Sequence, residues 1–198
     1  SHAGNFLYML TGNKPDKEME RVFDVCLILH ADHTFNASTF AAREVASTRA
    51  HMYSAVSAAV GALSGELHGG ANFEVMKMLL DIKDEKNAES WVKSKIENGD
   101  RIMGMGHAVY KTVDPRSMVL KELSKKLSVK TGLPWFEITK KVEEVTAGMM
   151  KNRKEKDIFP NVDLYSASVY HMLDIPMDLN TPIFAISRVS GWTAHVIE

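Results

Sequence analysis

Apolar residues recur at helical spacing along nearly the whole chain, and no segment shows sustained alternation with β-branched residues. The segment from 15 to 31 shows the pattern, with apolar residues three or four positions apart at Met19, Val22, Phe23, Cys26 and Leu29. Turn-forming and capping residues separate such segments, as Pro15 and Asp16 do here. The sequence therefore predicts an all-α protein of about eight to nine helices.

Composition excludes several classes of protein. The 198 residues carry 24 Lys+Arg and 25 Asp+Glu, so a net charge of -1 gives no sign of nucleic-acid or anionic-membrane binding. The single cysteine, Cys26, excludes an internal disulfide and suits a reducing compartment. No apolar run approaches the roughly 18 residues that span a bilayer, and the N-terminus lacks a signal-peptide pattern. We expect a cytoplasmic protein without nucleic-acid or membrane partners.

The stretch RIMGMGHAVYKTVDPR, from Arg101 to Arg116, is the strongest candidate for a functional loop. Gly104 and Gly106 permit backbone conformations and close ligand approach that a Cβ would forbid. Asp114 and Pro115 suit the N-cap and first turn of a helix. His107, Lys111 and Arg116 thus lie close together in sequence at a loop-to-helix junction.

Other polar segments interrupt the apolar pattern around His33, around His68 and at Asp163, which follows a Pro-Asn turn. His68 precedes a helix, whose unpaired N–H groups and dipole disfavour positive charge, so we expect a neutral ring near pH 7. Each residue alone has an ordinary explanation: a cap or packing role for the histidines, a helix cap for Asp163, and surface pairing for Arg116 and Arg188. Together they indicate a distributed active site.

Four segments resemble the core motifs of the citrate synthase family, in the same order and over nearly the whole chain: LHADHTFNAST, LSGELHGGANFEV, GMGHAVYKTVDPR and PNVDLYSASVYHML. The resemblance implies a multihelical fold with a large and a small domain. It implies condensation of acetyl-CoA with oxaloacetate and water to give citrate and CoA. It also implies a homodimer that needs no metal and no cofactor, since acetyl-CoA is a substrate.

The resemblance assigns roles to residues. It implies that His68 hydrogen-bonds the thioester carbonyl as the enol forms, that Asp163 removes the methyl proton, and that His107 polarises the ketone of oxaloacetate. The carboxylates of oxaloacetate are then held by His33, Arg116 and Arg188. The CoA-binding residues are implied to be Arg101, Gly104, Gly106, Lys111 and Asn161.

These residue types suit that chemistry. Removing a proton beside a thioester requires a base and, at the same time, a donor at the oxygen where negative charge develops. An anionic Asp163 supplies the base, and a neutral His68 supplies an N–H. Guanidinium groups match carboxylates in a paired geometry, which fits two arginines to a dicarboxylate.

The resemblance also divides the chain into domains. Residues 1–68 are expected to belong to the large domain, 69–173 to form the small domain, and 174–198 to return to the large domain. Closure of the small domain over oxaloacetate would keep water from the thioester. Relative to the family, the chain is expected to lack an N-terminal helical region and a C-terminal arginine, so we expect little activity from these 198 residues alone.

Three alternatives remain open. A close relative, 2-methylcitrate synthase, uses propionyl-CoA with the same catalytic residues. A metal-binding helical module could use His30, Asp32 and His33, with Cys26 one turn earlier. A non-catalytic, ligand-sensing relative would keep the fold without the chemistry, although all three catalytic side chains are present.

Overall fold

The computed structural model describes the chain except for residue 108, residues 155–156 and the side chains of residues 153–154. The described residues form ten α-helices, one 3-10 helix and no β-strand, which confirms the all-α prediction. The helices are α1 His2–Thr11, α2 Lys17–His30, α3 Ala37–Ser47, α4 Met52–Leu63, α5 Ala71–Ile82, α6 Glu85–Glu97, α7 Pro115–Thr131, α8 Trp135–Lys154, α9 Val162–Met172 and α10 Asn180–Ile197, with the 3-10 helix Met177–Leu179 before α10.

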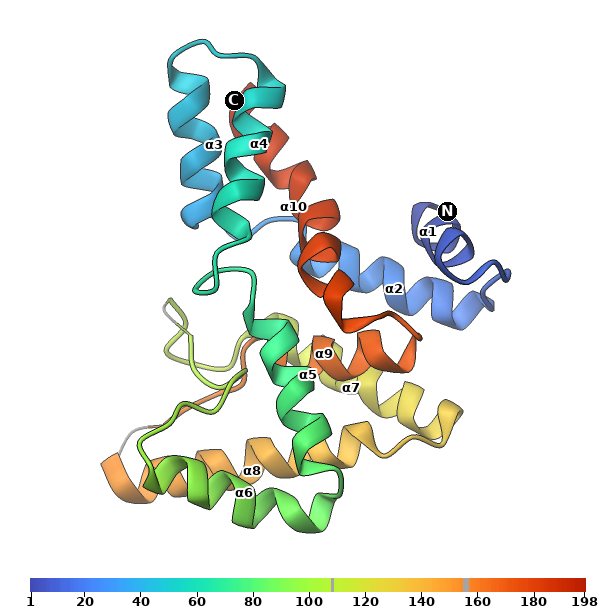
Figure 1. Ribbon diagram of the computed structural model, residues 1–198, viewed down its shortest axis with the longest axis vertical. Helices are drawn as coiled ribbons and strands as arrows, with labels where there is room; N and C mark the ends of the chain where they lie inside the picture. The colour runs from blue at the N-terminus through green and yellow to red at the C-terminus, as the bar shows by residue number, and fades with distance from the viewer. Residues whose placement is uncertain (108, 155–156) are drawn as a thin grey trace. The chain divides into compact units, whose positions relative to one another are not determined.

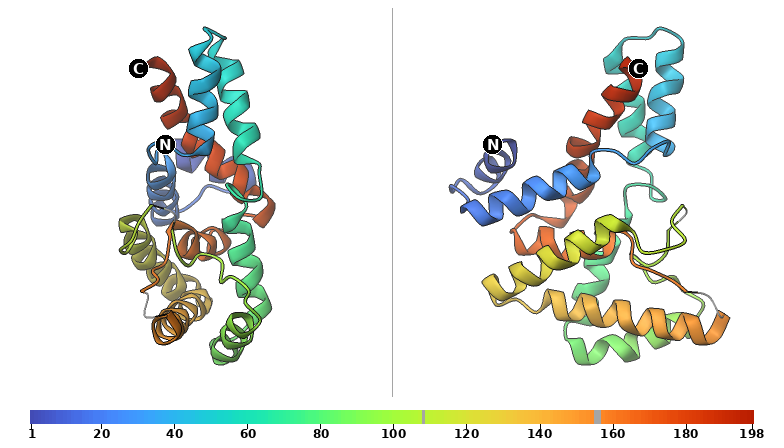
Figure 2. Two further views of the ribbon diagram at one scale, coloured as in Figure 1. Left: turned by 90° about the vertical axis from the view of Figure 1, so that its left-hand side faces the viewer. Right: turned by 180° about the vertical axis from the view of Figure 1, so that it is seen from behind.

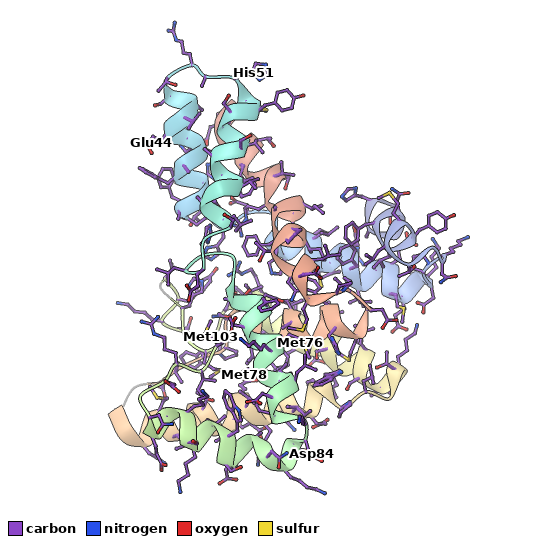
Figure 3. The ribbon with its side chains drawn as sticks, viewed as in Figure 1. Glu44, His51, Met76, Met78, Asp84 and Met103 are labelled. Atoms are coloured by element: carbon purple, nitrogen blue, oxygen red, sulfur yellow. The ribbon has the colours of Figure 1, made fainter. Side chains whose placement is uncertain are left out.

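Side-chain caps set most helix starts. Asp16, Asn36 and Asp114 each accept a hydrogen bond from a backbone N–H two or three residues later. His51 and Asp84, labelled in Figure 3, do the same for α4 and α6. The cap at Asp84 starts α6 six residues before the first large apolar side chains of the helix, Trp91 and Val92.

The chain divides into two compact units. Unit 1 comprises residues 1–70 and 178–198, and unit 2 comprises residues 71–177. Unit 1 thus contains α1 to α4 and α10, and unit 2 contains α5 to α9. The assignment of residues 69–173 to a small domain stays a prediction.

In unit 1, α10 packs against α2, α3 and α4, and the paired helices α3 and α4 lie side by side (Figures 1 and 2). A core cluster forms where α3, α4 and α10 meet; it consists of Ala42, Ala59, Leu63 and Trp192. Because alanine is small, the helix axes approach closely at this cluster. Trp192, which α10 contributes, therefore packs against residues of both α3 and α4.

In unit 2, α9 is the central helix and contacts α5, α7 and α8, while α6 lies along α8 (Figure 2). Nine of its residues are buried. Small polar side chains allow this burial because they pair with one another: Ser168 lies 2.9 Å from Ser124 of α7, and Ser166 accepts from Asn72 of α5. The start of α9, which carries Asp163, is therefore fixed by three neighbouring helices.

Among the described residues, no helix is both long enough and apolar enough to cross a membrane.

Candidate active site

His68 lies in the loop between α4 and α5, where its ring meets the N-terminus of α3. The backbone N–H of Ser38 donates to His68 Nε2 at 3.3 Å, and Ser38 Oγ lies 2.8 Å from the same nitrogen. A backbone N–H can only donate, so Nε2 accepts and carries no proton. The neutral ring therefore has its proton on Nδ1, the other nitrogen.

The surroundings of His68 favour this neutral form. Burial lowers the pKa of His68, and the nearby positive charge of Arg188 lowers it further. The result agrees with the prediction of a neutral ring, but the physical cause differs. The prediction relied on the helix that follows His68, whereas burial and the charge of Arg188 lower the pKa and a backbone hydrogen bond of His68 opposes them.

Arg188 occupies the interior of unit 1, with 1% of its surface exposed. Its Nε donates to the carbonyl of His30 at 2.7 Å, and its guanidinium carbon lies 4.6 Å from the centre of the Phe184 ring. The ring of Phe184 also contacts His68, with centroids 6.2 Å apart. Surface pairing, the ordinary explanation for this arginine, is thus wrong. Phe184 brings the predicted residues Arg188 and His68 into one neighbourhood.

His33 lies in the loop between α2 and α3 and is half-buried. Its carbonyl accepts from the Asn36 side chain at 3.3 Å. The preceding residues are held by α10, since the N–H of Gly191 donates to the carbonyl of Ala31 at 3.2 Å. A Cβ on Gly191 would lie 2.4 Å from that carbonyl oxygen, so only glycine permits the contact.

In unit 2, the predicted functional loop pairs with the segment that precedes α9. Gly104 has φ +80, and a Cβ there would lie 2.9 Å from Leu164. The carbonyl of Gly104 accepts from the N–H of Asn161 at 2.9 Å, and the N–H of Gly106 donates to the carbonyl of Phe159 at 2.8 Å. The two glycines therefore let this loop lie directly against the start of α9.

Asn161 links the loop to Asp163. Its Nδ2 donates to the carbonyl of Gly106 at 2.9 Å, and its Oδ1 accepts from the N–H of Asp163 at 2.9 Å. Asn161 is the N-cap of α9, and Asp163 lies in the first turn. The ordinary explanation of Asp163 as a helix cap is therefore wrong.

His107 is held by its own loop. Its Nδ1 accepts from the backbone N–H of Val109 at 3.0 Å and of Tyr110 at 3.1 Å. The neutral ring therefore has its proton on Nε2. Burial lowers the pKa of His107; the carboxylate of Asp114 opposes the shift, and the charge of Arg116 adds to it.

Arg116 forms a two-point ion pair with Asp114, with Nε–Oδ1 at 3.0 Å and Nη2–Oδ2 at 2.8 Å. Asp114 is only 1% exposed and also caps α7 through the N–H of Arg116. Burial alone would raise the pKa of Asp114, but the hydrogen bonds and charge of Arg116 outweigh it and hold the pKa below its usual value. The guanidinium is thus fixed in orientation.

A pocket of about 660 Å³ lies in unit 2 beside this loop. Three of the predicted CoA-binding residues line it: Arg101, Gly104 and Asn161. Ala71 and the apolar side chains of Ile96, Met150 and Ile158 also contribute. Gly106 and Lys111 are not among its lining residues. The lining also includes two acidic residues, Glu97 and Asp100, beside the cationic Arg101.

A family model described as citrate synthase, C-terminal domain, matches residues 1–198. The chain belongs to the citrate synthase family. It is 51% identical over 197 residues to citrate synthase 2 of Bacillus subtilis, covering 99% of this chain and 51% of that protein. It is 45% identical over 196 residues to the 2-methylcitrate synthase of Shewanella oneidensis, covering 99% of this chain and 51% of that protein.

A solved citrate synthase structure has the same fold. The enzyme from Thermoplasma acidophilum, described as a ternary complex with carboxymethyl coenzyme A and oxaloacetate, matches with a TM-score of 0.92 and 40% identity. The match covers 100% of this chain and 52% of that one. The chain spans about half the length of the curated relatives it matches.

The metal-binding alternative finds no support in this member of the citrate synthase family. His30 is buried, and its Nδ1 lies 2.8 Å from the carbonyl of Cys26. Burial raises the pKa of the Cys26 thiol, which opposes the thiolate form that metals bind. Within the part of the chain that the structure describes, no three His, Cys, Asp or Glu side chains form a group that could hold a metal ion.

Sequence reasoning missed two residues near the citrate synthase motifs. Ser38 lies in the first of the four motifs but was given no role in the site, yet it binds the His68 ring. Trp192 was not considered, yet its indole N–H donates to Ser38 Oγ at 3.1 Å. A usable signal existed for Trp192, because it follows Arg188 by four positions and so shares its helix face.

Proposed function

We propose that the protein containing this chain condenses acetyl-CoA with oxaloacetate and water to give citrate and CoA. The observation that carries the proposal is the state of His68. The Ser38 N–H occupies Nε2, so a neutral ring presents a proton on Nδ1. A neutral N–H donor is what a thioester carbonyl needs when negative charge develops on its oxygen.

In the first step, the Asp163 carboxylate takes a proton from the acetyl methyl group while His68 Nδ1–H donates to the thioester oxygen. The electron pair of the broken C–H bond becomes the double bond of the enol, and the developing charge is carried at the oxygen beside His68. Base and donor act together, since neither a free carbanion nor a protonated thioester is accessible near neutral pH.

In the second step, the enol carbon attacks the ketone of oxaloacetate, and His107 Nε2–H donates to the ketone oxygen. His33, Arg116 and Arg188 hold the two carboxylates. The two-point pair between Asp114 and Arg116 supports this role, because it fixes the guanidinium before substrate binds. Hydrolysis of the resulting citryl thioester by water releases citrate and CoA.

We propose that CoA binds in the pocket of unit 2 that is lined in part by Arg101, Gly104 and Asn161. Gly106 and Lys111 extend the contact along the loop. The proposed reaction needs no cofactor. The C–H bond that breaks supplies the electron pair of the enol, and the enol supplies the electron pair of the new carbon–carbon bond. We also propose a homodimer, which sedimentation of the whole protein tests.

A second candidate uses propionyl-CoA in the same reaction. The similarity to a 2-methylcitrate synthase at 45% identity favours testing it. Turnover with acetyl-CoA and with propionyl-CoA is measured at matched concentrations. We expect the higher kcat/KM with acetyl-CoA, and a large preference for propionyl-CoA would replace the first proposal with the second.

The base is tested by Asp163→Asn in the whole protein. We expect turnover to fall about 10²- to 10⁴-fold while oxaloacetate still binds, because the amide keeps the size of the side chain but cannot accept the proton. Asp24→Asn is the matched control, since Asp24 is a partly exposed carboxylate paired with Arg21. Unchanged turnover in Asp163→Asn would refute the proposed base.

A further inference from the structure

The loop between α2 and α3 carries His33, and the residue directly after His33 is strained. Thr34 has a φ of 51°, a left-handed backbone conformation that β-branched residues rarely adopt. Such a conformation is unfavourable and persists only where neighbouring contacts hold the backbone in place. The contacts of the two flanking residues, Asp32 and Phe35, therefore show what holds this loop.

Asp32 connects the loop to α10 through both of its carboxylate oxygens. Oδ2 accepts from the backbone N–H of Thr34 at 3.2 Å, which closes a turn around His33. Oδ1 lies 3.3 Å from Nε2 of His195 on α10. The carboxylate also lies over Gly191, one turn before His195, because a Cβ on that glycine would lie 2.9 Å from Oδ1. Asp32 thus joins α10 to the amide of the strained residue.

Arg43 of α3 fixes the ring of His195. Its Nη1 lies 3.3 Å from both Nδ1 and the carbonyl oxygen of His195. A guanidinium can only donate, so Nδ1 accepts and the neutral ring carries its proton on Nε2, the nitrogen that faces Asp32. The guanidinium carbon also lies 5.6 Å from the centre of the Phe35 ring, and Nη1 pairs with Glu198 at 3.6 Å. The same arginine therefore orients the ring and contacts the other flank of the loop.

We propose that His195 is a positioning residue for His33, acting through Asp32. The N–H of His195 holds the Asp32 carboxylate, and the carboxylate holds the amide of Thr34, so the backbone on both sides of His33 is fixed. The inference rests on the proposed function for its catalytic consequence, because His33 is proposed to bind a carboxylate of oxaloacetate. The side chains of His195 and Asp32 are 21% and 48% exposed, and exposed pairs add little to stability. The effect is therefore expected on the loop and not on the melting temperature.

Two amide substitutions in the whole protein test where the donor must lie. The amide nitrogen of His195→Gln reaches as far along the side chain as Nε2, whereas that of His195→Asn lies at the position of Nδ1. We expect His195→Asn to raise KM for oxaloacetate about three- to tenfold, the effect of one lost polar contact, with kcat unchanged. His195→Gln should keep KM close to that of the unaltered protein. An unchanged KM in His195→Asn, or equal increases in the two variants, would overturn the proposal.

The amide of Thr34 reports on the loop without substrate. Its hydrogen exchange is followed by NMR in ¹⁵N-labelled protein. We expect faster exchange in His195→Asn and retained protection in His195→Gln, because the amide loses its acceptor when the Asp32 carboxylate is released. His2→Asn is the control, since His2 is an exposed histidine of α1, and it should change neither KM nor the exchange of Thr34. Unchanged exchange in His195→Asn would contradict the inference.

A double-mutant cycle tests the route through Asp32. Because Asp32→Ala already removes the acceptor of the Thr34 amide, His195→Asn should raise KM no further in that background. Multiplying increases would show that His195 acts by another route, and the inference would then fail. If His195→Asn does not fold, His195→Leu carries the same measurements, since it also lacks a donor at the Nε2 position.

The outcomes for the two proposals are distinguishable. If the unaltered protein forms neither citrate nor 2-methylcitrate but the exchange of Thr34 responds to His195→Asn, the proposed function fails and the positioning role stands. If citrate forms and neither KM nor the exchange of Thr34 responds, the positioning role fails alone.

Discussion

His68 in unit 1 and His107 in unit 2 each accept backbone N–H groups at one ring nitrogen. The donors lie at very different distances along the chain from the two histidines. His107 Nδ1 accepts N–H groups two and three residues ahead, within its own loop. His68 Nε2 accepts from Ser38, 30 residues away, and Ser38 is bound by Trp192, 154 residues further along. A local turn fixes one ring, whereas tertiary packing fixes the other. Damage to packing should therefore affect the two histidines unequally.

The largest effect is expected from Asp114→Ala in unit 2. Removing one partner of a buried ion pair leaves the Arg116 charge unpaired and takes away the cap of α7, so we expect a loss of about 3 to 5 kcal/mol. Urea denaturation measures it. Asp114→Asn keeps the cap and should lose clearly less. Equal losses in the two variants would show that the charge of Asp114, which both variants remove, carries the stabilisation and that its cap contributes little.

The next effect, in unit 1, is expected from Gly191→Ala. The new Cβ would lie 2.4 Å from the Ala31 carbonyl oxygen and 2.9 Å from Asp32 Oδ1, so the loop before His33 must shift. We expect a loss of about 1 to 3 kcal/mol from overpacking, together with a higher KM for oxaloacetate. Gly61→Ala is the control, since a Cβ there meets nothing within 4 Å. An unaffected KM in Gly191→Ala would show that α10 does not position His33.

A smaller effect is expected from Asn161→Ala, which breaks the link between the loop of His107 and the first turn of α9. Loss of the cap should cost about 1 kcal/mol, measured by urea denaturation, and turnover should fall because Asp163 loses its support. Asn161→Ser retains a cap but does not reach Gly106, so it should recover stability without recovering turnover. Full recovery of turnover in Asn161→Ser would assign Asn161 to capping alone.

The features that could be predicted from the sequence depend on local contacts, and those that could not depend on contacts between distant parts of the chain. Helix starts at Asp16, Asn36 and Asp114 could be predicted because a capping side chain bonds to an N–H two or three residues later. The burial of Arg188 could not be predicted, since a charge on a helix is usually exposed. The partners of His68 were equally inaccessible, because they meet only after α3, α4 and α10 have packed together.

The roles of the site residues came from the resemblance to the citrate synthase family rather than from the helical pattern. Family membership is confirmed over the whole chain. The roles themselves stay predictions, because hydrogen bonds within each unit fix how a side chain is held and not which substrate atom it meets. The geometry adds the tautomers of His68 and His107, which no motif contains.

The smallest expected effect is on the pH dependence of stability, and it tests whether both rings must be neutral. Burial is the main cause that lowers the pKa of His68 and of His107, so each folded-state pKa lies below the unfolded value near 6.5. Well above pH 6.5 neither state binds these protons, so the two rings should add no pH dependence to stability. As pH falls below 6.5, the unfolded chain binds protons that the folded rings refuse, so the free energy of unfolding should decrease. Urea denaturation at pH 7.5 and 5.5 measures the decrease, and His68→Asn and His107→Asn should each remove part of it. An unchanged decrease in either variant would mean that the fold does not hold that ring neutral.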